Sequence, residues 1–267
     1  MLKHIVRPGV RLRLDRMDPA DTSGFAGVKD DGRKELERLT ARLERLQELL
    51  YAGHAHSMLV VLQGMDSAGK DGTIRRVFQG VNPQGVRVAS FKAPSDHEAE
   101  HDFLWRVHEQ VPARGEMVLF NRSHYEDVLY PRVHGLITKP VWERRYREIN
   151  GFERTLASEG TTLLKFFLHI SRDEQKKRLE ARLDDPTKHW KFRESDVRER
   201  RRWTAYTRAY EDTLSNTSTS WAPWYVVPSD RKWYRDLVVS ERIVDALEKL
   251  RMKYPPLPPE LRSERIR

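Results

Sequence analysis

The amino-acid sequence predicts an α/β protein built on a five-stranded parallel sheet that is buried on both faces. The first observation behind this prediction is a series of short, mostly apolar runs, separated from one another by stretches with helical periodicity. The second is a glycine-rich loop that lies directly between the first apolar run and a helix-like stretch. The five runs are residues 58–62, 86–91, 117–120, 163–170 and 224–227.

A helix over residues 31–53 is predicted to precede the first strand. Leucines recur there at steps of three and four residues, and Gly53 ends the pattern. We interpret this stripe as packing on the domain, because the repeat is too short for a coiled coil. Its members are Leu36, Leu39, Leu43, Leu46 and Leu50.

The chain is expected to form one domain with two different ends. Residues 1–30 are interpreted as a basic, irregular arm, residues 31–253 as the domain, and residues 254–267 as a basic tail broken by prolines. The start of the chain has no apolar core that leads to a small-residue cleavage site, so we read no secretion signal.

Composition limits the classes of function. The 267 residues are 38% hydrophobic and 33% charged, which is typical of a soluble globular protein, and no apolar stretch approaches the roughly 20 residues of a membrane span. Without cysteine there is no disulfide framework and no thiolate chemistry, in agreement with a cytoplasmic location. The net charge of +9 favours polyanionic partners: nucleic acid, phosphorylated substrates or anionic lipid.

The glycine-rich loop matches the GxxxxGK pattern of phosphate-binding loops. Gly64 is followed by four residues and then by Gly69 and Lys70. Backbone N–H groups of such a loop converge on phosphate oxygens, and its lysine reaches the transferred phosphate. Further predicted members of this phosphate site are Ser67, Ala68, Asp71, Gly72 and Arg75.

The loop carries two candidate magnesium ligands. Asp71 stands where phosphate loops usually have the Ser or Thr that holds Mg²⁺, and Asp66 is a second carboxylate inside the loop. Magnesium prefers one or two carboxylates together with waters and phosphate oxygens. The spacing alone does not choose between the two.

The third strand is followed by the sequence NRSHYEDV, which begins at Asn121. The carboxyl end of a strand is where open α/β sheets place their ligands. Arg122 can clamp a phosphate through two hydrogen bonds, and Ser123 with Glu126 reads as a capping box that opens a helix. Asp127 supplies a carboxylate that Asn121 lacks. For Glu126, the alternative to a role in the site is a favourable charge pair at a helix N-terminus.

Four segments of the chain together resemble the family-2 polyphosphate kinases, in particular their class III, over roughly residues 30–252. In that family the loop reads G-x-D-x-x-G-K-D-G, so Asp71 is the family's own form. Class III has Asn at the position of Asn121, where other members have Asp. The segments are GMDSAGKDGTIRRVFQGVNPQGVRVASFKAPS from Gly64, HDFLWRVH from His101, FNRSHYEDVLYPRVH from Phe120 and WYVVPSDRKWYRDLVVSERI from Trp224.

The resemblance implies a three-layer α/β/α P-loop kinase fold with a helical lid at about residues 171–215. It also implies reversible phosphoryl transfer from inorganic polyphosphate to ADP and AMP with Mg²⁺ (or Mn²⁺). The implied catalytic residues are Asp66, Lys70, Arg122 and Asp127, of which Asp66 and Asp127 hold the metal. The implied nucleotide-binding residues are Lys92, Asn121, Arg122, Glu126 and Arg132.

The segment that matches the lid has its own signals. Ser171 and Glu174 read as a capping box that opens a helix, which Pro186 must end. On this helix Arg178 and Arg182 are four residues apart and share one face, where they are expected to bind polyphosphate. An ordinary solvated face explains part of the basic run that follows.

Two alternative functions are compatible with part of the pattern. One is an ATP-dependent nucleoside or small-molecule kinase of the same fold, and the other is a non-catalytic protein that binds polyanions or nucleic acid. Against the second, an interleaved aromatic and basic platform is not evident, and a binder has no need of Lys70 framed by glycines. The expected partners are therefore polyphosphate and adenine nucleotides, without nucleic acid or membrane. Apolar helix faces make a homodimer or homotetramer plausible.

Overall fold

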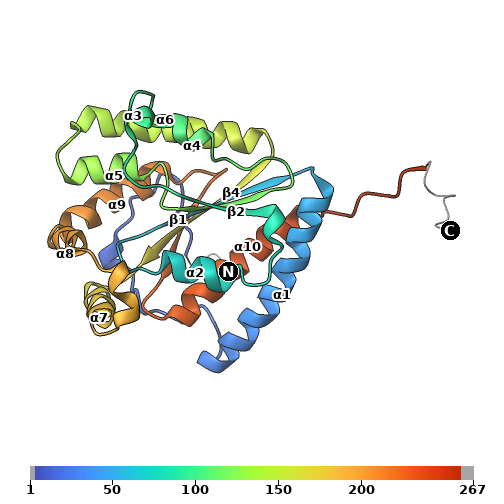
Figure 1. Cartoon of the computed structure of the whole chain (residues 1–267), viewed down its shortest axis with the longest axis horizontal. Helices are drawn as coiled ribbons and strands as arrows, with labels where there is room; N and C mark the ends of the chain where they lie inside the picture. The colour runs from blue at the N-terminus through green and yellow to red at the C-terminus, as the bar shows by residue number, and fades with distance from the viewer. Residues whose placement is uncertain (1–3, 260–267) are drawn as a thin grey trace.

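Five parallel strands form the central sheet in residues 4–259, the part of the chain that the computed structural model describes (Figure 1). Their order across the sheet is β2-β3-β1-β4-β5, and every neighbouring pair is parallel, as the sequence predicts. The strands are β1 (Ser57–Gln63), β2 (Val86–Ser90), β3 (Met117–Asn121), β4 (Thr161–His169) and β5 (Trp224–Pro228).

Helices cover both faces of the sheet, which gives the predicted three-layer α/β/α arrangement (Figure 1). One layer contains α1 (Lys29–Gly53), α2 (Lys70–Val77) and α10 (Lys232–Lys249), and the other contains α5 (Glu126–Val133), α6 (Lys139–Ser158) and α9 (Trp203–Thr217). The short helices α3 (Asp96–Ala99) and α4 (Trp105–His108) lie beside α6 in Figure 1.

Between β4 and α9 the chain forms two α-helices and a 3-10 helix. We call α7 (Arg172–Leu183), the 3-10 helix η3 (Pro186–Lys191) and α8 (Glu194–Arg201) the lid segment. Two further 3-10 helices are η1 (Leu14–Arg16) and η2 (Pro83–Gly85). The lid segment lies at one side of the sheet in Figure 1, next to α9.

The leucine stripe of α1 is buried, as predicted. Leu43 is fully buried and the other members are at most 5% exposed, because this face of α1 packs against α10. The strand β1 is buried over its whole length, as its uninterrupted apolar run predicts for a central strand covered on both faces.

The N-terminal arm packs on the domain over its described part, residues 4–28. The amide of Val6 donates to the carbonyl of Trp224, and Ile5 forms an antiparallel bridge with Tyr225 on the edge strand β5. Val6 and Leu14 are buried. The arm therefore covers the edge that β5 would otherwise expose.

The tail leaves the domain after α10 (Figure 1). Tyr254 and Leu257 are exposed. Residues 1–3 of the predicted arm and 260–267 of the predicted tail lie outside the described residues. Among residues 4–259, no helix combines the length and the apolar character needed to cross a membrane.

The strand order decides where the site is. β1 pairs with both β3 and β4, and Leu62 lies opposite Asn121 in the register. The loop after β1 and the loop after β3 therefore leave the same edge of the sheet side by side, at the carboxyl ends of the strands.

Candidate active site

The loop after β1 has the backbone that a phosphate loop requires. Gly64 and Gly69 have φ values of 154° and 115°, in the region that favours glycine. A Cβ atom on Gly69 would lie 1.8 Å from Nη1 of Arg235, and one on Gly64 would lie 2.8 Å from the carbonyl oxygen of Leu168. The chain therefore depends on glycine at both positions, and α2 begins directly after Gly69.

Lys70 is the first residue of α2 and is 9% exposed. Its Nζ donates to the carbonyl of Gly64 at 2.7 Å, and the residue lines the cleft described below. Burial lowers the pKa of Lys70, the positive charge of Arg122 acts in the same direction, and Asp66 opposes both. A buried ammonium with these neighbours is an effective partner for a phosphate anion.

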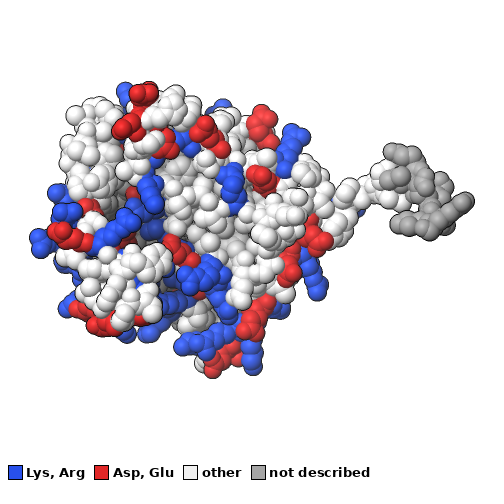
Figure 2. Space-filling view, in the orientation of Figure 1, with Lys and Arg blue, Asp and Glu red and all other residues white. Residues whose placement is uncertain are grey.

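A cleft of about 1380 Å³ opens at the carboxyl edge of the sheet, between the loop after β1, the loop after β3 and the lid segment. Its lining contains many more lysines and arginines than acidic residues. Figure 2 shows basic side chains gathered in the region of α7 and α8. The acidic lining residues are Asp66, Asp71, Glu126, Asp196 and Glu199. The cleft thus suits a ligand with several negative charges.

Arg122 connects the two loops. Its Nη2 donates to Asp66 at 2.8 Å, and Nη1 lies 3.7 Å from Glu126. Burial tends to lower the pKa of Arg122, but the carboxylates of Glu126 and Asp66 raise it above its ordinary value. Its φ of 62° is unusual for a residue other than glycine. The guanidinium is held charged, beside the phosphate loop.

Asn121 contacts the loop from the end of β3. Its Nδ2 donates to Oδ1 of Asp71 at 2.8 Å, so the two positions at which this chain differs from common phosphate-loop kinases touch each other. Asp71 is also 4.0 Å from Nζ of Lys191 in the lid segment. An aspartate at position 121 would bring a second carboxylate against Asp71.

The predicted capping box of Ser123 and Glu126 is wrong. The helix α5 begins only at Glu126, and the Ser123 hydroxyl accepts from the amide of Tyr125. The Glu126 carboxylate instead accepts from Gln63 at 3.2 Å and faces Arg122. Gln63 and Arg122 therefore engage the carboxylate that the capping box would have placed on the backbone amide of Ser123.

Two of the predicted charged site residues do not line the cleft. Asp127 accepts from Nη2 of Arg106 at 2.9 Å, and Arg106 is 6% exposed. Arg132 pairs with Asp212 and stacks over the ring of Trp142. Neighbours on a helix point about 100° apart, so the cleft side of α5 takes Glu126 and not Asp127. In this structure both side chains are therefore bound by partners outside the cleft lining.

Most other predicted site residues line the cleft. Gly64 and Ala68 do not, although the Ala68 carbonyl accepts from Arg178 at 3.0 Å. The hydroxyl of Ser67 is buried without a hydrogen-bond partner in the described structure. The predicted residues in the lining are Asp66, Ser67, Gly69, Lys70, Asp71, Gly72, Arg75, Lys92, Asn121, Arg122, Glu126, Arg178 and Arg182.

Arg178 supports the phosphate loop from the lid segment. Its guanidinium donates to the carbonyls of Ser67, Ala68, Ser229 and Asp230, the shortest bond being 2.6 Å to Ser229. Burial lowers the pKa of Arg178. The prediction of Arg178 as a simple polyphosphate contact missed this second task, because the four acceptors lie about 50 or more residues away along the chain.

The predicted capping box of α7 is half formed. The Ser171 hydroxyl accepts from the amide of Glu174, as predicted, but the amide of Ser171 donates to Asp230 and the Glu174 carboxylate pairs with Arg178. The helix ends at Leu183, ahead of Pro186, as predicted. On the same face, Arg182 lies 3.7 Å from Asp196.

Arg235 is a site residue that the sequence analysis missed. It lies in the first turn of α10, is 3% exposed, donates to the carbonyl of Ala68 and lines the cleft. Asp236 holds its guanidinium at 2.8 Å. The signal was its position a few residues after β5, since ligands collect at the carboxyl ends of the strands.

The acidic groups of the cleft fit a magnesium ion bound together with phosphate. Among the described residues, no cluster of three or more histidine, aspartate or glutamate side chains could hold a metal by itself. Magnesium in kinases needs one or two protein carboxylates, with phosphate oxygens and waters completing the octahedron. Asp66, Asp71 and Glu126 line the cleft and are the candidates.

Comparisons with known proteins identify the family of this chain. The family model "Polyphosphate kinase 2" matches residues 27–255. The chain is 58% identical to the AMP/ADP-polyphosphate phosphotransferase of Meiothermus ruber, over 100% of this chain and 99% of that protein. It is 46% identical to an ADP-polyphosphate phosphotransferase of Rhodopseudomonas palustris, over 92% of this chain and 89% of the relative. The crystal structure of polyphosphate kinase 2 from Arthrobacter aurescens superposes with a TM-score of 0.91 at 48% identity, covering 94% and 90% of the two chains.

Proposed function

The chain belongs to the polyphosphate kinase 2 family and catalyses polyphosphate-dependent phosphoryl transfer to nucleotides; from this premise we propose that it accepts both ADP and AMP, reversibly and with Mg²⁺. The observation that carries the proposal is the convergence of Lys70, Arg122 and Asp66 in a cleft that the basic lid segment also lines. The name of the Meiothermus ruber relative and the neutral Asn121 support AMP as a second acceptor.

Transfer in this site proceeds by positioning and charge neutralisation, without a covalent enzyme intermediate. The backbone amides of the loop and Lys70 hold the transferred phosphoryl group, and Lys70 opposes the charge that develops on it. Arg122 holds the phosphate of the acceptor nucleotide, in line with the donor. The polyphosphate chain lies along the cations of the lid segment.

Asp66 would hold Mg²⁺, with Asp71 or Glu126 as a second protein ligand. The bound ion would neutralise charge on the phosphate oxygens. Arg122 already donates to Asp66, so a hydrogen bond from the loop after β3 fixes the orientation of this carboxylate within the cleft.

A donor exchange tests the proposed function. The protein is incubated with ADP and Mg²⁺ and either long-chain polyphosphate or ATP with a panel of nucleosides. We expect ATP to form from ADP only when polyphosphate is present, and EDTA to abolish the reaction. Phosphorylation of a nucleoside by ATP, with no transfer from polyphosphate, would instead support an ATP-dependent kinase.

Replacing Arg182 with alanine is expected to weaken the use of polyphosphate more than the use of ADP. Arg182 lies on the cleft face of α7. The carboxylate of Asp196 is 3.7 Å from its guanidinium, beyond hydrogen-bond distance, so the guanidinium can still bind a phosphate of a long anion. We expect the KM for polyphosphate to rise about 3- to 10-fold, the size of one partly screened charge interaction.

Lys176→Ala is the matched control for this prediction. Lys176 lies on the same helix, 64% of its side chain is exposed, and it pairs with Glu180 outside the cleft lining. Steady-state kinetics with each substrate varied in turn checks the result. An equal rise of both KM values in Arg182→Ala would place Arg182 at the nucleotide or in packing.

Asn121→Asp is expected to reduce the preference for AMP over ADP. The new carboxylate would face Asp71, 2.8 Å from the present amide nitrogen, and would repel the incoming phosphate of a short acceptor. We expect the ratio of kcat/KM for AMP to that for ADP to fall about tenfold, with polyphosphate and Mg²⁺ held constant.

Asn121→Ala separates charge from hydrogen bonding. It also loses the bond to Asp71 but adds no negative charge, so its ratio is expected to stay closer to that of the wild type. An unchanged ratio in Asn121→Asp would indicate that Glu126 or the lid segment, and not residue 121, determines which acceptor is used.

A further inference from the structure

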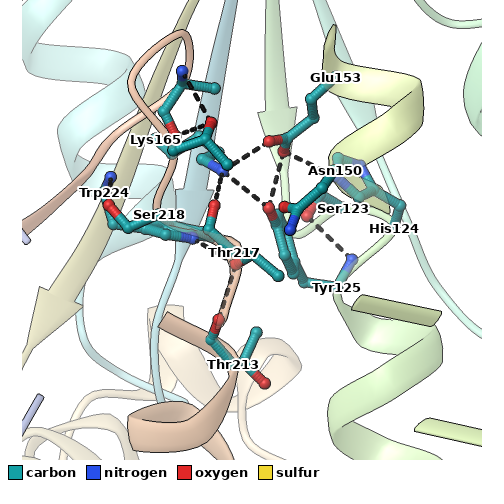
Figure 3. A network of polar contacts seen from close by, with 12 residues as sticks. Ser123, His124, Tyr125, Asn150, Glu153, Lys165, Thr213, Thr217, Ser218 and Trp224 are labelled. Carbon is teal, nitrogen blue, oxygen red and sulfur yellow. Dashed lines mark hydrogen bonds and ion pairs between the residues drawn. The ribbon is translucent and has the colours of Figure 1, made fainter. Parts of the chain in front are cut away.

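A fully buried ion pair lies in the core next to the site. Lys165 on β4 and Glu153 on α6 are both 0% exposed, and their Nζ and Oε2 atoms are 2.6 Å apart (Figure 3). Neither residue lines the cleft, and the transfer described above uses neither. The sequence analysis treated residue 165 as one position of an apolar strand.

The pair is the centre of a network of short hydrogen bonds (Figure 3). Nζ of Lys165 donates to Glu153, to the hydroxyl of Tyr125 at 2.9 Å and to the carbonyl of Thr217 at 2.7 Å. The Tyr125 hydroxyl in turn donates to Oε1 of Glu153 at 2.7 Å, and Nε2 of His124 contacts the same oxygen at 3.2 Å. The network joins β4, α6, the loop after β3 and the end of α9.

Stability alone does not account for this pair. Taking two charges out of water costs about as much as their attraction returns, and apolar residues of similar volume often serve equally well. Burial tends to raise the pKa of Glu153, but the ammonium of Lys165 lowers it below its ordinary value. Beyond packing, the pair fixes the orientation of the groups around it, because its short hydrogen bonds reach defined atoms of four elements.

The network's position in the chain identifies what it orients. His124 and Tyr125 lie between Arg122 and Glu126, both of which line the cleft. Tyr125 is also the N-cap residue of α5, and it is 0% exposed. Holding the Tyr125 ring and hydroxyl therefore restricts the backbone on both sides, including the unusual φ of Arg122.

We propose that Lys165, Glu153 and Tyr125 are positioning residues that hold the segment from Arg122 to Glu126 in place beside the phosphate loop. This rests on the proposed function, because the tasks given to Arg122 and Glu126 make their placement matter for turnover. A displacement of about 1 Å in such groups can cost orders of magnitude in rate.

The double variant Lys165→Met/Glu153→Gln tests the proposal. It removes both charges together, so no unpaired charge is left, and the amide oxygen that replaces the carboxylate would still accept from Tyr125. We expect a thermal midpoint within about 4 °C of the wild type. We expect kcat with ADP to fall about tenfold, while the KM for polyphosphate, which binds at the lid segment, changes less than about threefold.

Lys139→Met/Glu143→Gln is the matched control, made on α6, the helix that carries Glu153. This pair is separated by 3.6 Å, with 71% and 47% of the side chains exposed, and is expected to leave kcat unchanged. A folded Lys165→Met/Glu153→Gln protein with wild-type kcat would overturn the proposal, because the pair would then be packing alone.

Tyr125→Phe decides the question if the double variant does not fold. It keeps the ring and removes only the hydroxyl between Lys165 and Glu153. We expect a 3- to 10-fold lower kcat, about the effect of one lost hydrogen bond in a positioning network, and faster amide hydrogen exchange in residues 121–129. Wild-type kcat, or wild-type exchange in these residues, would overturn the proposal.

Hydrogen exchange also distinguishes a failure of the proposed function from a failure of the proposed positioning role. If the wild type transfers nothing from polyphosphate, the proposed function fails. Exchange in residues 121–129 that stays unchanged in Tyr125→Phe overturns the positioning role itself, whichever reaction the protein catalyses.

Discussion

Lys70→Ala is expected to lower kcat for transfer from polyphosphate to ADP by at least about 100- to 1,000-fold, the loss seen when a single preorganised group that stabilises transition-state charge is removed. Lys70 donates to the loop carbonyl of Gly64, and burial strengthens its field because little water screens it. The fold is expected to persist, since the side chain's own hydrogen bonds are to the carbonyls of this loop.

Initial rates of ATP formation at saturating polyphosphate and ADP measure this effect. Circular dichroism and the thermal midpoint show whether the variant is folded. Lys139→Ala, with 71% of its side chain exposed at the start of α6, controls for the loss of one positive charge. Near wild-type turnover in Lys70→Ala would show that Lys70 is not at the reacting centre.

Arg178→Ala is expected to lower kcat about 100-fold and to weaken polyphosphate and ADP together. The guanidinium bonds two carbonyls of the phosphate loop and two at the end of β5, so its removal loosens the loop that cradles the transferred group. The loss of these charge-assisted bonds is also expected to destabilise the fold by about 2 kcal/mol.

Arg178→Lys and Lys177→Ala complete this test. Lysine keeps the charge but cannot reproduce the planar fork that reaches four carbonyls, so Arg178→Lys is expected to recover only part of the rate. Lys177 is the exposed neighbour on α7, and its removal is expected to have little effect. A selective rise in the KM for polyphosphate in Arg178→Ala would contradict the loop-supporting role and restore the simpler interpretation of Arg178 as a polyphosphate contact.

The elements that were predicted correctly are those that local physics specifies. The apolar runs of β1, β3, β4 and β5 predict strands because a strand covered on both faces needs nearly continuous apolar residues, whereas only Ala89 of the edge strand β2 is buried. The leucine stripe of residues 31–53 is a buried helix face because leucines spaced three and four residues apart lie on one side of a helix. The phosphate loop was predictable because its glycines and Lys70 act within nine residues of one another.

The structure gives partners outside the cleft to two charged residues of the predicted site. Asp127 was taken for a metal ligand, but Arg106 binds it from another helix. Arg132 was assigned to the nucleotide, but Asp212, 80 residues further along the chain, pairs with it. Neither partner can be read from the residues around the site, because only folding brings them within reach.

The sequence by itself therefore determined the class of fold, the phosphate loop and, through the resemblance, the family and its reaction. The tertiary structure decided which charges face the cleft. It turned Glu126 inward and Asp127 away, gave Arg178 the carbonyls of the loop, and added Arg235 from α10. The physical reason is that strands and helices follow from backbone bonding and local periodicity, whereas the partner of a charged side chain depends on groups that are distant in the chain and adjacent only in space.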